Sequence, residues 1–225
     1  MPVKGFIFDF DGLIIDTESA DLYSWQDTYA EFRLDFPIYH WIENLGRDPE
    51  VFDVHQHFAS VAPKGVNLAE VYDRRRANKL TRVSQTELLP GVLQTLDYAQ
   101  NNNLRIGMAS SSPSSWVLPH LQRLGIDHRF EVVFTKDDVA HTKPSPELYI
   151  KALNALGLQP DEAIVFEDSP NGILAAKSAG IYCVAVRTAY TSYLDVSQAD
   201  HLVDSLESTK LENILMQVNT RSAIA

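Results

Sequence analysis

The sequence has little of what secreted and membrane proteins need. Its one cysteine, Cys183, cannot form an internal disulfide, which favours a reducing compartment. No apolar run approaches the roughly 18 residues that a transmembrane helix needs, and the first residues show no signal peptide pattern. We therefore expect a cytoplasmic protein.

Positive charge is also scarce. Among 225 residues, 19 are Lys or Arg and 30 are Asp or Glu, so the formal net charge is −11. A chain this acidic is poorly suited to the phosphate backbone of nucleic acids or to an anionic membrane surface. We expect neither as a partner.

Several catalytic signatures are missing from the sequence. It contains no G-x-S-x-G, Walker A or G-x-G-x-x-G motif, which excludes the nucleophile elbow of the α/β hydrolases and the glycine-rich nucleotide-binding loops. The histidines form no metal-binding pattern either, since His55 and His57 would point to different faces of a helix. A zinc site is therefore not expected.

What the sequence does contain is a regular alternation of strand-like and helix-like segments. The first strand is expected at about Val3 to Phe10, an apolar and aromatic stretch typical of a buried parallel strand. Alternation from residue 88 onward predicts βαβ units, and hence an α/β fold with a Rossmann-like parallel sheet. The later strands are expected at 104–110, 131–135, 163–169, 182–186 and 201–204, and the helices at 92–100, 114–125, 146–157, 171–180 and near the C-terminus.

Residues 16–87 interrupt this alternation with helical periodicity. We predict that they form an α-helical cap domain, inserted into an α/β core domain made of residues 1–15 and 88–225. Asp16 and Thr17 are suited to begin its first helix. The apolar residues spaced three or four apart are Leu22, Trp25, Tyr29 and Phe32, then Val51, Val54 and Phe58, then Leu68, Val71, Tyr72 and Leu80, with Pro37, Pro49 and Pro63 between the three groups.

Polar side chains follow the core strands at the point where each strand ends. Ligands of open parallel sheets bind beyond the carboxyl ends of the strands, so these side chains are predicted to meet at one edge. They are Asp9 and Asp11 after the first strand, Ser110 after the second, Lys143 in the loop after the third, and Glu167 and Asp168 after the fourth.

This set of side chains suits phosphoryl transfer. One carboxylate can attack phosphorus and form an aspartyl-phosphate, and a second can protonate the leaving oxygen and later deprotonate water. Clustered carboxylates raise one another's pKa unless a cation intervenes, and Mg²⁺ prefers oxygen ligands of this kind. A calcium loop is excluded because Leu13 stands where a further oxygen ligand is needed.

Four stretches resemble the motifs of the haloacid dehalogenase superfamily, in order, over residues 5 to 187. They are FDFDGLIIDTE, MASSS, KPSPELY and FEDSPNGILAAKSAG. The helical insertion resembles the small cap of the β-phosphoglucomutase-like branch, which would close over the sheet edge and select the substrate.

The resemblance implies a role for each candidate residue. Asp9 would be the nucleophile and Asp11 the general acid and base, while Ser110 and Lys143 would bind the transferring phosphate. Arg47 in the cap, next to Gly46, would reach a second anionic group of the substrate. Mg²⁺ would be held by the Asp9 carboxylate, the Asp11 carbonyl and Asp168, with Glu167 in or beside the coordination shell.

The resulting hypothesis is a Mg²⁺-dependent phosphatase that hydrolyses a small phosphomonoester, such as a sugar phosphate or related metabolite, through an aspartyl-phosphate. Asp11 argues against carbon–halogen cleavage, because the dehalogenase branch lacks this second aspartate. A β-phosphoglucomutase-like mutase is the alternative hypothesis; it is weakened, though not excluded, by Asp21, which stands where sugar phosphomutases of this branch have a histidine. A catalytically silent phosphometabolite-binding protein is a third hypothesis.

Purely structural roles of the same residues remain as alternatives. Glu167 and Asp168 could simply cap the helix that follows them, Lys143 could be a solvated loop residue, and Arg47 could form a surface salt bridge. Ser111 and Ser112 are expected to cap the helix after Ser110. The run Arg74–Arg76 is expected to be a solvated helix face.

Overall fold

The structure is a computed structural model that describes residues 2–45, 52–190 and 193–222. The chain divides into two compact units. The first, the core unit, comprises Met1–Ile15 and Leu88–Ala225, and the second, the cap unit, comprises Asp16–Glu87. Each unit is described by itself.

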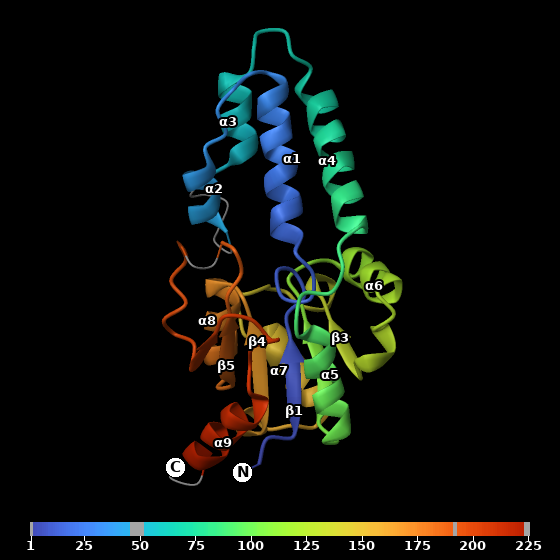
Figure 1. Cartoon of the computed structure of the whole chain (residues 1–225), viewed down its shortest axis with the longest axis vertical. Helices are drawn as coiled ribbons and strands as arrows, with labels where there is room; N and C mark the ends of the chain where they lie inside the picture. The colour runs from blue at the N-terminus through green and yellow to red at the C-terminus, as the bar shows by residue number, and fades with distance from the viewer. Residues whose placement is uncertain (1, 46–51, 191–192, 223–225) are drawn as a thin grey trace. The chain divides into compact units, whose positions relative to one another are not determined.

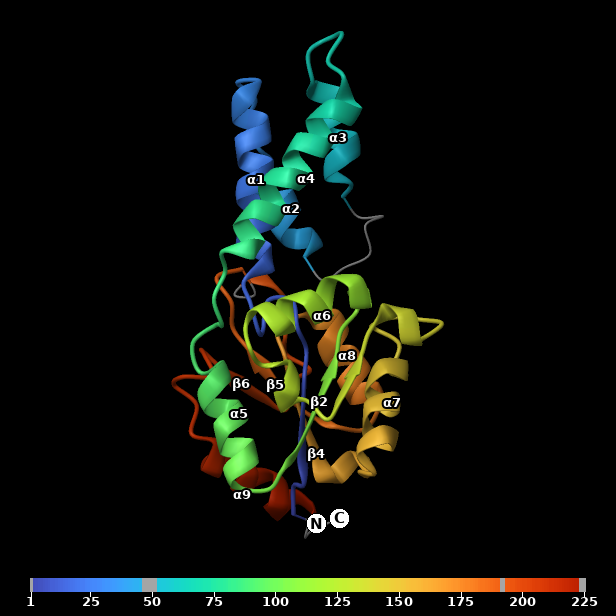
Figure 2. The ribbon, with the colours of Figure 1, turned by 90° about the vertical axis from the view of Figure 1, so that its right-hand side faces the viewer.

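The core unit is built on a six-stranded sheet in which all neighbouring strands are parallel (Figures 1 and 2). The strand order is β3-β2-β1-β4-β5-β6, so the N-terminal strand lies in the middle. This arrangement confirms the predicted Rossmann-like α/β class. The strands are β1 Gly5–Phe8, β2 Arg105–Ala109, β3 Val132–Phe134, β4 Ala163–Glu167, β5 Tyr182–Val186 and β6 His201–Val203. The helices are α5 Val92–Asn101, α6 Ser114–Arg123, α7 Glu147–Leu156, α8 Pro170–Ser178 and α9 Leu211–Ser222, with short 3₁₀ turns at Asp127–Arg129, Lys136–Asp138 and Pro160–Glu162.

Helices cover the sheet on both faces, because alternate strand residues point to opposite sides. Ile7 of β1 belongs to a buried cluster with Leu148 of α7 and Ile173 of α8. On the other face Phe8 stacks against Phe166 of β4, with ring centroids 5.1 Å apart. Figure 2 shows α7 and α8 on one side of the sheet and α5 on the other.

The register of the three central strands decides where the polar side chains go. Phe8 of β1 lies opposite Met108 of β2 and opposite Phe166 of β4. The residues that follow these three positions are therefore level with one another at the carboxyl edge. β1 ends at Phe8 rather than near Phe10, because the ladder to both neighbours stops there.

The cap unit consists of four helices. Its core is aromatic, with Trp25, Tyr29 and Phe58 almost fully buried. Asp16 begins α1, as predicted, and its side chain accepts a hydrogen bond from Ser19 N at 2.8 Å. The helices are α1 Thr17–Glu31, α2 Ile38–Asn44, α3 Val54–Val61 and α4 Leu68–Ser84.

Two predictions about the cap were wrong. The short helix α2 was missed, because its seven residues are too short a stretch for the spacing of Ile38, Trp41 and Ile42 to repeat. Leu80 was assigned to the apolar face of α4, yet 45% of its surface is exposed. The residues that α4 buries are Val71 and Val83 instead.

A partly buried charge network joins α1 to α4 within the cap. Asp21 accepts from Arg75 at 3.0 Å and from Lys79 at 2.8 Å, and Trp41 of α2 donates to it at 3.3 Å. The Arg75 guanidinium also lies 4.4 Å from the centre of the Trp25 ring. Burial works against the ionised form of Asp21, but Lys79 and Arg75 hold its pKa below the usual value.

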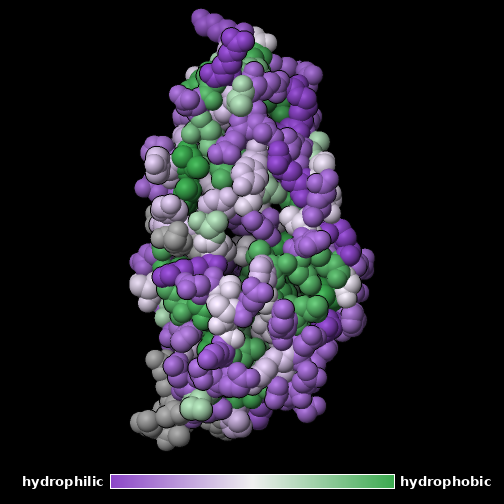
Figure 3. Space-filling model, viewed as in Figure 1, coloured by the Kyte–Doolittle hydropathy of each residue, from purple (hydrophilic) through white to green (hydrophobic). Residues whose placement is uncertain are grey.

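The visible surface of the core unit is mainly hydrophilic, with hydrophobic residues gathered around α6 (Figure 3). Leu118 of that helix is 42% exposed. None of the helices in the described part of the chain is long and apolar enough to cross a membrane.

Candidate active site

The site begins at the end of β1, where the chain leaves the sheet in a tight turn. Asp9 donates its backbone N–H to Phe166 O at 3.1 Å, and its side chain is almost fully buried. Gly12 follows with a φ of +78°, a conformation that glycine adopts without the strain of a side chain. The turn closes through Gly12 N, which donates to Ile15 O at 2.9 Å.

Lys143 reaches this carboxylate from the loop between β3 and α7. Its ammonium group donates to Asp9 Oδ1 and, at 2.6 Å, to Glu167 Oε1. Only 4% of its side chain is exposed, so it is not a solvated loop residue. Burial opposes its charged form, but Asp9 and Glu167 raise the pKa of Lys143 above the usual value, so it stays charged.

Glu167 at the end of β4 is saturated with hydrogen bonds from the protein. Its Oε1 accepts from Lys143 and from the hydroxyl of Tyr149 at 2.7 Å. Its Oε2 accepts from Asp168 N at 3.0 Å, and from the backbone N–H and the hydroxyl of Ser169 at 3.1 Å each. These five donors fix the carboxylate and favour a role as the counter-ion of Lys143.

The first turn of α8 leaves room for this carboxylate only because residue 172 is glycine. A Cβ atom on Gly172 would lie 1.7 Å from Glu167 Oε1. The helix is capped by Ser169, whose hydroxyl accepts from Gly172 N at 3.1 Å. The structural reading in which Glu167 or Asp168 caps α8 is therefore wrong.

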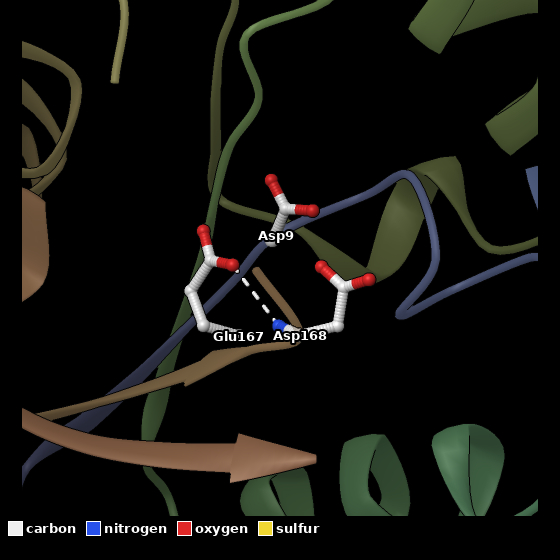
Figure 4. Close-up of side chains that lie close together, drawn as sticks. All are labelled: Asp9, Glu167 and Asp168. Atoms are coloured by element: carbon white, nitrogen blue, oxygen red, sulfur yellow. Dashed lines mark hydrogen bonds between the residues drawn. The ribbon is translucent and has the colours of Figure 1, made fainter. Parts of the chain in front are cut away.

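Three acids gather at the ends of β1 and β4 (Figure 4). Asp9, Glu167 and Asp168 each offer a carboxylate oxygen within 4.8 Å of the others, and all three are buried. Together with Lys143, these four side chains carry three potential negative charges and one positive charge. Burial and the charge of Glu167 raise the pKa of Asp9 to about 8, although Lys143 opposes the shift.

The donor set fits a hard divalent cation. Carboxylate oxygens are the ligands that Mg²⁺ prefers, and a charge of +2 would balance the excess of negative charge in the cluster. Because Glu167 is already held by five donors, Asp9 and Asp168 are the side chains best placed to bind such an ion.

The second aspartate of the motif takes a different direction. Asp11 Oδ2 accepts from the Ser112 hydroxyl at 2.6 Å, and Oδ1 accepts from the indole N–H of Trp116 at 2.9 Å. Among the described residues, its carboxylate is not part of the three-acid group. The prediction that Ser112 caps α6 is therefore wrong. The residue at the cap position is Pro113.

Ser110 lies at the end of β2, next to the same turn. It is 99% buried, and its backbone N–H donates to Phe134 O at 2.9 Å. Its hydroxyl accepts from Ser112 N at 3.0 Å. Ser110 is thus fixed in the loop that also supplies a partner of Asp11.

The structure brings most of the predicted site residues to one edge of the core sheet, while Arg47 lies outside the described residues. Three contributors were missed: Tyr149, Ser112 and Trp116. Tyr149 stood inside the quoted stretch KPSPELY, so its spacing from Lys143 was a usable signal. Nothing in the sequence indicates that Trp116 turns toward Asp11.

The run Arg74–Arg76 in the cap was expected to form a solvated helix face. Arg75 is largely buried, so this prediction is wrong for that residue.

Comparison with known proteins decides the family. The family model described as haloacid dehalogenase-like hydrolase matches residues 6–186. The chain belongs to this family. The recognition from sequence is confirmed, and so is the class of enzyme, a phosphoric monoester hydrolase of the haloacid dehalogenase superfamily.

Individual relatives of this haloacid dehalogenase-like hydrolase match 80% or more of its length. The Bacillus subtilis (strain 168) protein named "Putative phosphatase YhcW" is 37% identical over 220 residues, 98% of this chain and 100% of its own. A "Phosphorylated carbohydrates phosphatase" of Thermotoga maritima is 30% identical over 80% of this chain and 82% of its own. The crystal structure titled "putative beta-phosphoglucomutase", also from Thermotoga maritima, is 26% identical with a TM-score of 0.76, covering 96% of this chain and 100% of its own.

Proposed function

We propose that the protein is a cytoplasmic, Mg²⁺-dependent phosphatase that hydrolyses a small phosphomonoester, such as a phosphorylated sugar, through an aspartyl-phosphate on Asp9. The observation that carries the proposal is the buried Asp9 carboxylate at the end of β1, held by Lys143 and grouped with Glu167 and Asp168. A buried carboxylate fixed by a buried cation is positioned to react, whereas a binding protein needs the cation but not the carboxylate.

Asp9 and Asp11 carry the two steps of the proposed reaction. First, an Asp9 oxygen attacks phosphorus and the bond to the leaving oxygen breaks, while that oxygen takes a proton from Asp11. Then Asp11 accepts a proton from water, the water oxygen attacks phosphorus, and phosphate leaves with Asp9 restored. The proton that Asp11 gives in the first step is therefore regained in the second.

Lys143 and Ser110 are proposed to hold the phosphoryl oxygens. Two of the three N–H donors of Lys143 go to Asp9 and Glu167, and the third would bind a phosphoryl oxygen. The Ser110 hydroxyl would donate to another as negative charge builds up. A Mg²⁺ ion held by Asp9 and Asp168, with the Asp11 carbonyl as in the family pattern, would neutralise part of that charge.

The resemblance to a β-phosphoglucomutase keeps the mutase as a second candidate. In that reaction Asp11 would take its proton from a sugar hydroxyl instead of water. We prefer hydrolysis, because the relatives with the two highest identities quoted above are named phosphatases and because Asp21 replaces the cap histidine of the mutases.

The test is phosphate release with Mg²⁺ from a panel of phosphorylated metabolites and from p-nitrophenyl phosphate. Asp9→Asn should lose activity by at least about a thousandfold, since the nucleophile is removed. The matched control is Asp97→Asn, an acid on the surface of α5 that pairs with Arg129 and should keep full activity. Phosphatase activity that survives in Asp9→Asn would refute the assignment of Asp9 as the nucleophile. Conversion of β-glucose 1-phosphate to the 6-phosphate faster than phosphate release would establish the mutase.

The panel also tests Arg47. If this residue binds a second anionic group, Arg47→Ala should raise KM for bisphosphates and leave KM for p-nitrophenyl phosphate unchanged. An equal effect on both kinds of substrate would contradict that role.

A further inference from the structure

Trp116, in the first turn of α6, is an aromatic side chain that the fold leaves partly uncovered. The helix is attached to the core through Val117 and Leu121, which are fully buried, whereas Trp116 is only half-buried. Its indole N–H donates to Asp11 Oδ1 at 2.9 Å. The anchoring of α6 therefore does not account for a large aromatic ring at this position, beside the proposed acid.

The Trp116 ring is held rigidly in its place beside Asp11. Its N–H end is fixed by that hydrogen bond, and His120 meets the ring edge-on with centroids 4.6 Å apart. His120 in turn stacks on the fully buried Phe10, with centroids 6.2 Å apart. A flat side chain that is already fixed loses little conformational freedom when a ligand packs on it, so the free protein has a preformed aromatic surface here.

Asp11 can serve a substrate while it keeps both of its partners. A carboxylate has about four lone-pair sites, and the Ser112 hydroxyl and the Trp116 indole occupy one on each oxygen. A leaving oxygen within hydrogen-bond reach of Oδ1 lies about 6 Å or less from the indole nitrogen, and about 8 Å or less if it uses Oδ2. The carbon skeleton bonded to that oxygen therefore begins next to the Trp116 ring.

We propose that the Trp116 ring is the surface on which the leaving group packs, and that it selects esters whose leaving group carries a ring, such as a sugar, over esters of short open-chain alcohols. The face of an aromatic ring carries negative partial charge, so it attracts the C–H bonds that line the face of a sugar ring or the edge of another aromatic ring. Open-chain alcohols offer less area to pack and lose more conformational freedom. The inference names the substrate class of the proposed phosphatase and rests on that function.

Benzyl phosphate and ethyl phosphate test the ring directly. Both are esters of primary alcohols of similar basicity, so both need a proton on the leaving oxygen, but only benzyl alcohol has a ring. The ratio of their kcat/KM values, benzyl over ethyl, therefore reports the packing of the leaving group. Defects in folding, metal binding or proton delivery alter both values alike and cancel in the ratio.

Three substitutions at Trp116 separate the ring from the N–H donor. Trp116→Leu removes both, Trp116→Gln removes the ring but keeps an N–H donor, and Trp116→Phe keeps a ring without the donor. We expect the two ringless variants to lower the ratio about fivefold, as the loss of one aromatic contact implies, and Trp116→Phe to lower it less than twofold. Either ringless variant suffices if the other folds poorly. The matched control is Leu118→Ala: Leu118 is 42% exposed on another face of α6, and its loss should leave the ratio unchanged.

An unchanged ratio in the ringless variants would overturn the inference. A fall in Trp116→Phe equal to that in the ringless variants would also overturn it, because the donor to Asp11 would then carry the effect. Either result leaves the phosphatase proposal intact, since release of phosphate by the wild-type protein tests it separately. If the wild-type protein hydrolyses neither ester nor any metabolite of the panel, the proposed function fails and this inference fails with it.

Discussion

Tyr149 and Glu167 are joined by a hydrogen bond of 2.7 Å between the tyrosine hydroxyl and Oε1, in the fully buried interior of the core unit. The same oxygen accepts from Lys143, whose ammonium lies 4.9 Å from the centre of the Tyr149 ring. Burial and the charge of Glu167 raise the pKa of Tyr149 well above its usual value, so the hydroxyl keeps its proton and remains a donor. The tyrosine thus positions both members of the ion pair.

Tyr149→Phe removes this donor and keeps the ring. We expect the free energy of unfolding to fall by about 1.5–3 kcal/mol, the range for a hydrogen bond to a charged group. We also expect kcat for p-nitrophenyl phosphate to fall about tenfold, because Lys143 loses part of the support that fixes it. Urea denaturation and steady-state kinetics measure the two effects.

The control is Tyr193→Phe, since the Tyr193 side chain is 67% exposed. It should change neither quantity measurably. A Tyr149→Phe protein with wild-type stability would mean that the other four donors satisfy Glu167 on their own.

Gly172→Ala tests the close approach of α8 to the Glu167 carboxylate. The added Cβ would overlap Oε1, which is held in place by Lys143 and Tyr149 and cannot move freely. We expect a loss of about 2–3 kcal/mol in the free energy of unfolding, as for overpacking of a rigid interior, together with lower phosphatase activity.

Gly125→Ala is the matched control for that substitution in the same unit. Gly125 has a φ of +70° and no atom within 4 Å of its Cβ position, so alanine there meets backbone strain but no clash. Its cost should be about 1 kcal/mol, with activity unchanged. Equal effects of the two substitutions would show that the carboxylate adjusts to the methyl group.

The architecture of the core was predictable because it depends on patterns that sequence displays directly. Strands such as 163–167 and 182–186 are short apolar runs bounded by helices, and polar residues at strand ends share an edge whatever the details of the register. The direction of individual side chains is different. Asp9 and Asp11 look equivalent in the sequence, yet one joins the acid group and the other turns to Trp116.

That divergence depends on contacts between segments about a hundred residues apart, which no local pattern contains. Trp116 lies on a helix that was predicted correctly, but the rotamer that brings its indole to Asp11 follows from its packing on His120. The helix α2 was missed for a different reason: Ile38, Trp41 and Ile42 do have helical spacing, but seven residues contain only one repeat of the pattern. Sequence predicted the elements and the meeting of the acids, while packing decides their orientation.

Asp21→Asn tests the charge network of the cap. The substitution keeps the acceptor oxygen but removes the charge shared by Arg75 and Lys79, so the free energy of unfolding at pH 7 should fall by about 1–3 kcal/mol. The folded protein holds the pKa of Asp21 below its usual 3.8, so this stability is fully present above pH 4. It is lost as the pH falls through the lower folded pKa.

The difference between wild type and Asp21→Asn should therefore shrink as urea denaturation is repeated at decreasing pH below about 4. Asp27→Asn is the matched control: Asp27 pairs with Arg82 between the same two helices, but 52% of its side chain is exposed. It should cost less than about 1 kcal/mol at any pH. A constant difference for Asp21→Asn across this range would mean that its charge does not support the fold.

Magnesium should stabilise the folded protein, because the three-acid group has three buried carboxyl groups and, among the ion pairs of the described residues, Lys143 pairs with only two of them, Asp9 and Glu167. At a Mg²⁺ concentration of about 100 Kd the linkage adds about 2.7 kcal/mol, which corresponds to a rise in Tm of about 5–10 °C for a chain of this size. EDTA should remove both this rise and the phosphatase activity. Calorimetry and thermal denaturation measure the effect without any substrate.

Asp168→Asn should abolish the rise in Tm, since it removes one of the two side chains best placed to bind the ion, whereas the surface variant Asp97→Asn should retain it. Glu167→Gln separates the two kinds of acid in the group. If Glu167 serves Lys143 and not the metal, this variant loses stability without Mg²⁺ but still gains most of the rise in Tm when Mg²⁺ is added. A Glu167→Gln protein whose Tm does not rise with Mg²⁺ would instead show that Glu167 is a ligand. The five hydrogen bonds of Glu167 would then have to rearrange when the ion binds.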